Sequence, residues 1–116
     1  MGIFQDKNPV PVVPFDEGGN PLTGRPAPST AGAGSSVNSS TNAVTLLLAN
    51  PARLGATVYN ESTAVLYLKL GAGAAVGSYT TQVQAGAYYE VPGNYCGVIT
   101  GVWASANGVA RVTELT

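Results

Sequence analysis

Residues able to do chemistry are few and widely separated in this sequence. The chain has no histidine, which removes the commonest general base and metal ligand. Its single cysteine, Cys96, has neither a histidine nor a nearby lysine that would favour the thiolate, so we interpret it as a small core or turn residue. One cysteine also excludes an intramolecular disulfide.

The carboxylates give no catalytic or metal-binding pattern. Glu61, Glu90 and Glu114 each stand alone, in a turn or on the outer face of an expected strand, and a solvated face is the simplest interpretation. The acidic pair Asp16 and Glu17 lies near the N-terminus without the spacing of a calcium loop. We therefore predict no catalytic residues, no metal and no cofactor, and a protein that is not an enzyme.

Two further features could bind a ligand. Residues 71–77, GAGAAVG, lack the Lys-Ser/Thr ending of a phosphate-binding loop, so we expect a flexible hairpin loop. Aromatic side chains suit a subunit interface or a glycan surface, because tyrosine and tryptophan offer a large ring with a polar tip. We favour interface or core over glycan for this set: Tyr88, Tyr89, Tyr95 and Trp103.

Composition narrows the class of protein. The chain has 116 residues, enough for one domain, and only 9% are charged, against about a quarter in a typical soluble domain. A net charge of −1 argues against nucleic acid or an anionic membrane as a partner. The N-terminus has no signal-peptide pattern and no apolar run is long enough to span a bilayer, so we expect synthesis in a cytoplasm. With 45% apolar residues, such a surface suits a protein packed against others.

The first 42 residues differ from the rest and are predicted to form an extended N-terminal arm and linker. Six of the eight prolines lie here, which excludes a helix or a central strand. Residues 29–42, STAGAGSSVNSSTN, indicate a flexible Gly/Ser linker. A free tail is the alternative, but we favour an assembly arm held by a neighbouring subunit. Its expected anchors are apolar: Ile3, Phe4, Val10, Val12, Val13, Phe15 and Leu22.

Residues 43–116 are predicted to form a small antiparallel β-sandwich or barrel of about seven strands. The clearest pattern is residues 57–71, in which two alternating runs flank the polar cluster 60–63, so we predict a β-hairpin. A second strand pair is expected around residues 84–86 and a third at Asn107-Gly108. Residues 97–104, GVITGVWA, are largely apolar and are predicted to form a central strand buried on both faces.

Three motifs cover about residues 56–115. They are N-x-S-x-x-x-L-Y-L-x-x-G, then G-x-x-x-E-x-P-x-x-Y-x-G-x-I-x-x-x-W, then G-x-A-x-V-T-E. Their residues in this chain are Asn60, Ser62, Leu66, Tyr67, Leu68 and Gly71; Gly86, Glu90, Pro92, Tyr95, Gly97, Ile99 and Trp103; and Gly108, Ala110, Val112, Thr113 and Glu114. In these motifs the chain resembles small β modules of tailed-bacteriophage virion proteins.

The resemblance implies a structural component of the virion, and it carries over no catalytic residue. The first expectation is a capsid decoration (cement) protein. Its partners would be the major capsid protein and other copies of itself, as a homo-dimer or homo-trimer. The alternatives are a neck or tail accessory protein, and a glycan- or host-surface-binding module of a head or tail fibre.

Overall fold

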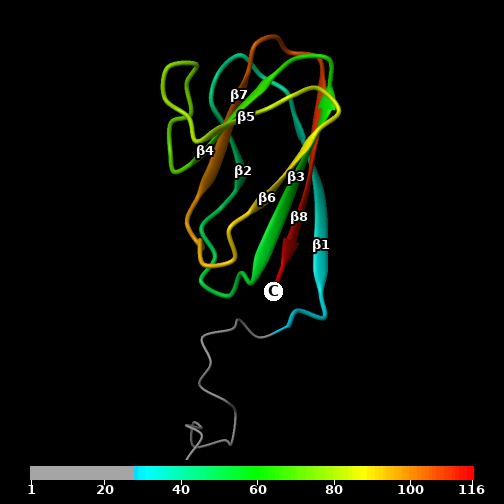
Figure 1. Cartoon of the computed structure of the whole chain (residues 1–116), viewed down its shortest axis with the longest axis vertical. Helices are drawn as coiled ribbons and strands as arrows, with labels where there is room; N and C mark the ends of the chain where they lie inside the picture. Colours follow the sequence, from blue (N-terminus) through cyan, green and yellow to red (C-terminus); the bar gives the residue numbers. More distant parts are fainter. Residues whose placement is uncertain (1–27) are drawn as a thin grey trace, which may run out of the picture.

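The computed structural model describes residues 28–116, which form two four-stranded antiparallel sheets packed face to face (Figure 1). This part of the chain contains no helix, so the predicted all-β sandwich is confirmed. It has eight strands where the sequence predicted about seven. They are β1 (Gly32–Asn38), β2 (Val44–Leu47), β3 (Gly55–Ser62), β4 (Leu66–Leu70), β5 (Thr81–Val83), β6 (Tyr88–Val91), β7 (Ile99–Trp103) and β8 (Gly108–Leu115).

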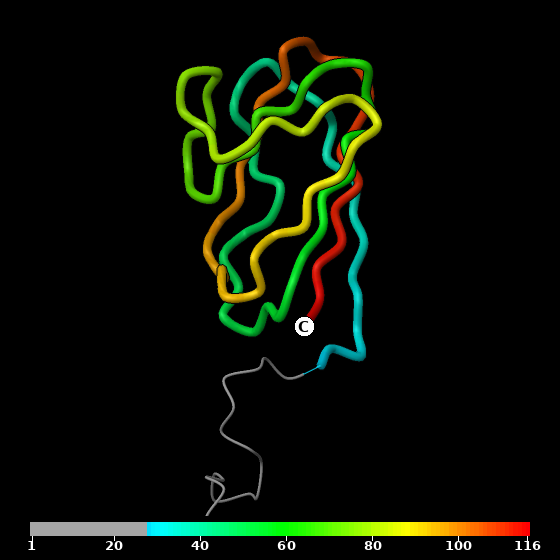
Figure 2. The backbone as a smooth tube through the Cα atoms, in the orientation of Figure 1, coloured from blue at the N-terminus to red at the C-terminus, as the bar shows by residue number. Residues whose placement is uncertain are grey.

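The strands alternate between the sheets as the chain proceeds. One sheet has the order β1-β8-β3-β6 and the other β2-β7-β4-β5. This is the strand order of a jelly roll, and the repeated crossing from layer to layer can be followed along the tube in Figure 2. Jelly rolls serve in viral capsids and in lectins alike, so the fold alone does not choose a function.

The three predicted hairpins are wrong. In each case the strands exist near the expected residues, but their partners lie in opposite sheets: β3 and β4, β5 and β6, and β7 and β8. The turn residues reverse the chain across the sandwich instead of within a sheet. The consecutive strands that do pair are β4 and β5, joined by residues 71–80, so the expected hairpin loop is present at residues 71–77.

The predicted flexible linker, residues 29–42, is also wrong over half of its length. Residues 32–38 form β1, which pairs with β8 in unbroken register from Gly32↔Leu115 to Asn38↔Val109. The boundary expected at residue 43 therefore leaves out a strand of the sandwich. A run of Gly, Ala and Ser has no alternation to mark it as a strand, and it is held by backbone pairing with its neighbour.

Inward-facing residues of both sheets make the core. Strand β7 is buried along its whole length, as predicted, and Trp103 is only 1% exposed. Gly101 leaves room in the core for leucine side chains of the two strands beside β7, since a Cβ atom there would lie 2.7 Å from Leu66 Cδ1 and 3.1 Å from Leu46 Cδ1. Thr100, on the outer face of β7, is also buried, and the loop of residues 71–80 contacts it.

Contacts to Thr100 anchor that loop. The Thr100 hydroxyl donates to the carbonyl of Gly71 at 2.6 Å and accepts from the amide of Ala74 at 3.1 Å. Ala74 is consequently 4% exposed. The sequence predicted a flexible hairpin loop at residues 71–77. These contacts attach the loop to the sheet at Gly71 and Ala74, while residues 75–80 are exposed.

Candidate functional site

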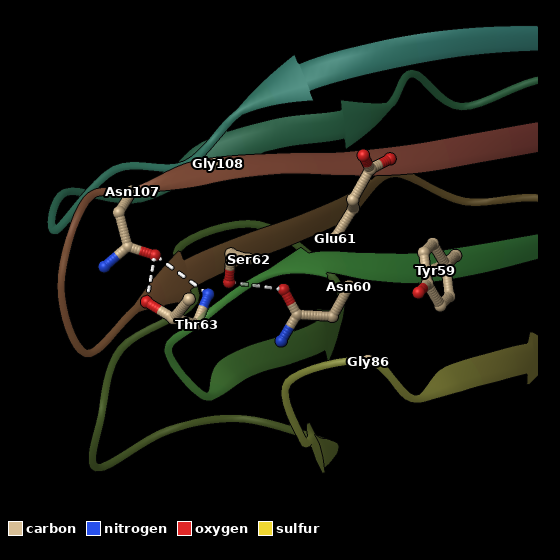
Figure 3. A pocket seen from close by; sticks show the side chains of 8 residues that line it. All are labelled: Tyr59, Asn60, Glu61, Ser62, Thr63, Gly86, Asn107 and Gly108. Atoms are coloured by element: carbon tan, nitrogen blue, oxygen red, sulfur yellow. Dashed lines mark hydrogen bonds between the residues drawn. The ribbon is translucent and has the colours of Figure 1, made fainter.

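A hollow of about 370 Å³ lies where β3 ends and β8 begins (Figure 3). Its lining comes from β3, from the turn after it, from the β5–β6 turn and from the start of β8. The lining residues are Tyr59, Asn60, Glu61, Ser62, Thr63, Gly86, Asn107 and Gly108. The volume is near the lower end of the range for small-molecule sites, roughly 300–1,000 Å³.

Asn60 forms the floor of the hollow and joins the two sheets. It is fully buried, and its side-chain amide donates to the carbonyls of Ala64 and Val83, each at 2.8 Å. Its side-chain oxygen accepts from Ser62 Oγ at 2.7 Å and from Trp103 Nε1 at 3.1 Å. All four hydrogen-bonding positions of the amide are filled, so Asn60 is structural and has none left for a ligand.

The rim of the hollow is held by a second set of internal bonds. Asn107 Oδ1 accepts from the amide and hydroxyl of Thr63, at 2.9 and 2.7 Å, which ties the β3–β4 turn to the β7–β8 turn. Gly108 has φ +92°, and a Cβ atom there would lie 2.8 Å from Ser62 Cα. Glycine is therefore required where β8 begins beside β3.

The outer face of the β1-β8-β3-β6 sheet carries an exposed row beside the hollow. Cross-strand pairing places Tyr88, Tyr59, Arg111 and Ser36 next to one another in that order. Arg111 Nε donates to Glu61 at 2.6 Å and its Nη1 donates to Ser36 Oγ at 2.7 Å. The hydrogen bond and the charge of Glu61 raise the pKa of Arg111 above its ordinary value.

The four aromatic residues singled out in the sequence do not gather on one surface. Tyr88 is 70% exposed on the outer face, whereas Tyr89 and Tyr95 are half-buried against the core. Tyr95 donates its hydroxyl to the carbonyl of Val98, and Trp103 lies in the core as expected. Tyr59, which sequence reasoning left out of this set, is the neighbour of Tyr88. Its outward position follows from the period-two pattern of β3.

Of the single carboxylates, two lie on the outer face and one does not. Glu61 and Glu90 are exposed as expected, but Glu114 faces inward and binds Arg53 at 2.8 Å. Arg53 is 2% exposed and also donates to the carbonyls of Leu48 and Gly97. This buried arginine links the β2–β3 connection, the β6–β7 connection and strand β8 at one end of the sandwich. Sequence reasoning missed it, because a single arginine before a strand has no distinguishing pattern.

The edge strand β1 is the other candidate surface. Six of its seven residues are exposed, and β8 is its single partner strand. The sequence GAGSSVN has no charge, no proline and no bulge against β8. The three other edge strands are short: β2 and β6 have four residues and β5 has three. Short or charged edges discourage pairing with other chains, and β1 has neither protection.

The expected arm anchors, Ile3, Phe4, Val10, Val12, Val13, Phe15 and Leu22, lie outside the described residues 28–116. Within that range, no group of three or more His, Cys, Asp or Glu residues could hold a metal ion. The same part of the chain contains no helix that could cross a membrane.

Comparison with known proteins gives no relative: no family, no curated protein and no solved structure matches this chain. The resemblance to tailed-phage virion modules therefore stays a hypothesis. Asn60, Ser62, Trp103 and Gly108, which belong to its motifs, hold the fold together in this chain.

Proposed function

We propose that this chain is a non-enzymatic virion structural protein, a capsid decoration protein that assembles through strand β1 and the segment before it. The observation that carries the assembly proposal is the long, regular and uncharged open edge of β1. The virion assignment rests on the three motifs that resemble tailed-phage modules. A neck or tail accessory protein would use the same edge.

The pairing with β8 shows which backbone groups of β1 point outward and are free to pair with another chain. Hydrogen bonds join Ser39 to Gly108 and Thr116 to Ala31, so odd-numbered residues of β1 face β8. The backbone N–H and C=O groups of Gly32, Gly34, Ser36 and Asn38 therefore point away from it. A second copy can pair with this edge in antiparallel orientation, related by a two-fold axis, which favours a dimer over a trimer.

Strand pairing alone would give a weak dimer. Seven paired residues form roughly seven hydrogen bonds, each contributing about 1 kcal/mol net. Loss of translational and rotational freedom opposes this by about 4–15 kcal/mol. The apolar residues of segment 1–27 would supply the remaining contacts, to the major capsid protein and to neighbouring copies, by avidity.

Light scattering of the full-length protein, with and without isolated phage heads, tests the proposal. We expect a concentration-dependent dimer that co-sediments with heads. Gly34→Pro removes an outward N–H and should abolish the dimer, whereas Gly34→Ala keeps that N–H, meets only ordinary contacts and should dimerise normally.

Deletion of segment 1–27 should leave a folded sandwich that no longer joins the particle. Deletion of residues 1–42 would be the wrong experiment, because it removes β1 and exposes β8 as a new edge. A full-length protein that is monomeric at every concentration, or a truncated one that still binds heads, would refute the proposal.

A further inference from the structure

Tyr59 and Tyr88 are large exposed rings that the fold does not use. They are cross-strand neighbours on the outer face and are 41% and 70% exposed. Within residues 28–116 neither hydroxyl has a hydrogen-bond partner, and the close ring pair is Tyr67 of β4 with Tyr79 of the loop of residues 71–80. The free faces of the two rings thus form an apolar platform with polar tips.

One positively and one negatively charged side chain lie beside this platform. Arg111 is the cross-strand neighbour of Tyr59, and Glu61 is two residues further along β3 on the same face. Their side chains are 57% and 51% exposed and their charges compensate each other. Within the described part of the chain, Arg111 Nη2 and the second oxygen of Glu61 have no partner. The face therefore offers a donor and an acceptor without net charge.

The lining of the adjoining hollow has one charged residue, Glu61, whose charge is compensated by Arg111. Asn60 directs its amide into the core, and Asn107 binds Thr63 across the rim (Figure 3). A charged ligand would find no unpaired charge in the hollow and would have to break the ion pair of Glu61 with Arg111. A neutral ligand with hydroxyl groups can bind while that pair stays intact.

We propose that Tyr59, Tyr88, Glu61 and Arg111 form a binding site for a neutral pyranose oligosaccharide. The C–H groups on the flat face of a sugar ring pack against the electron-rich faces of the tyrosines. The ring hydroxyls, which both donate and accept, reach Glu61 Oε2 and Arg111 Nη2. The hollow holds the next unit of the chain. This site is independent of assembly through β1, because pairing at the sheet edge leaves the outer face open.

Titration of ¹⁵N-labelled full-length protein tests the site. The probes are maltotriose, cellotriose and the trimer of N-acetylglucosamine at millimolar concentrations. We expect at least one to shift amide resonances of β3, β6 and β8 around Tyr59, Tyr88 and Arg111. Tyr88→Ala should weaken that binding about tenfold, through loss of the stacking ring. Tyr88→Phe keeps the ring and should bind as the native protein does.

A control uses a tyrosine elsewhere that is about as exposed as Tyr59. Tyr79 is 39% exposed in the loop of residues 71–80, and Tyr79→Ala should leave sugar binding unchanged. Absence of shifts with all three sugars, shifts confined to another surface, or full affinity in Tyr88→Ala would overturn the proposal. So would a loss of self-association in Tyr88→Ala, which would make this face a protein interface. Gly34→Pro should bind sugar normally, so the two proposals can fail separately.

Discussion

The outer faces of the two sheets differ in whether the chain covers them. On the β2-β7-β4-β5 face, residues 71–80 bury Thr100 and Ala74 and bring Tyr79 to within 5.1 Å of Tyr67, ring centre to ring centre. On the β1-β8-β3-β6 face no segment of residues 28–116 performs this role, and Tyr88 is left 70% exposed. Side chains on the covered face serve the fold, whereas those on the bare face are available for binding.

The largest expected effect comes from Asn60, because it joins the sheets that carry both faces. Asn60→Ala removes four hydrogen bonds: the carbonyls of Ala64 and Val83 lose an amide donor, and the buried indole N–H of Trp103 loses its acceptor. We expect a loss of about 4 kcal/mol in the free energy of unfolding.

Urea denaturation measures this loss, and Asn60→Asp serves as the isosteric comparison. A carboxylate cannot donate to the two carbonyls, so Asn60→Asp should be at least as destabilising. A loss below about 1 kcal/mol in either variant would show that the sheets are held together without this residue.

A substitution at Thr100 tests how much the loop of residues 71–80 stabilises the β2-β7-β4-β5 face. Thr100→Val keeps the shape of the side chain but leaves the Gly71 carbonyl and the Ala74 amide unpaired under the loop. We expect a loss of about 2 kcal/mol, together with faster hydrogen exchange in residues 71–80. Thr57→Val, on the bare face, is the matched control and should change stability by less than about 0.5 kcal/mol. Equal effects at the two positions would contradict the comparison.

The positions of most strands could be predicted from the sequence, whereas their pairing with distant strands could not. Period-two alternation and turn residues placed strands β3 to β8 to within a few residues. They could not assign strands to sheets, because a polar turn has the same appearance whether it stays in one sheet or crosses to the other. At the end of β3, the inward-facing Asn60 binds Ala64, Val83 and Trp103. Val83 and Trp103 are distant in the sequence, so a local pattern cannot reveal these contacts.

Replacing one tyrosine on each outer face compares how much the two faces contribute to stability. Tyr67→Ala removes the edge-to-face contact with Tyr79 and half-buried area, and should cost about 2 kcal/mol. Tyr88→Ala should cost less than about 0.5 kcal/mol. Thermal unfolding of the two variants measures the difference. A larger loss for Tyr88→Ala would mean that the bare face serves stability after all.

The smallest expected effect concerns the ion pair on the bare face. Glu61 and Arg111 are both more than half exposed, so solvent and salt screen their attraction. Glu61→Gln should leave the unfolding temperature unchanged at low and high salt, while removing one sugar contact. A clear fall in the unfolding temperature at low salt would show that the pair is a stabilising element.

The candidate site was only partly predictable. Exposure of Tyr88 and burial of Trp103 follow from strand patterns, but the grouping of Tyr88 with Tyr59, Glu61 and Arg111 requires that β6, β3 and β8 be neighbours. No local pattern states that order. The strand β1 was missed for a related reason, because its small residues give no alternation and it is ordered by β8, more than seventy residues away.

The position of β8 between β1 and β3 also has a consequence for biosynthesis. Both neighbours leave the ribosome before β8, and neither can complete its pairing until residues 108–115 have emerged. The sheet that bears the tyrosines and the open edge therefore forms only after β8 has been synthesised. Until then β1 is a strand without a partner, and crowding of nascent chains on one messenger RNA would favour pairing between copies at this stage.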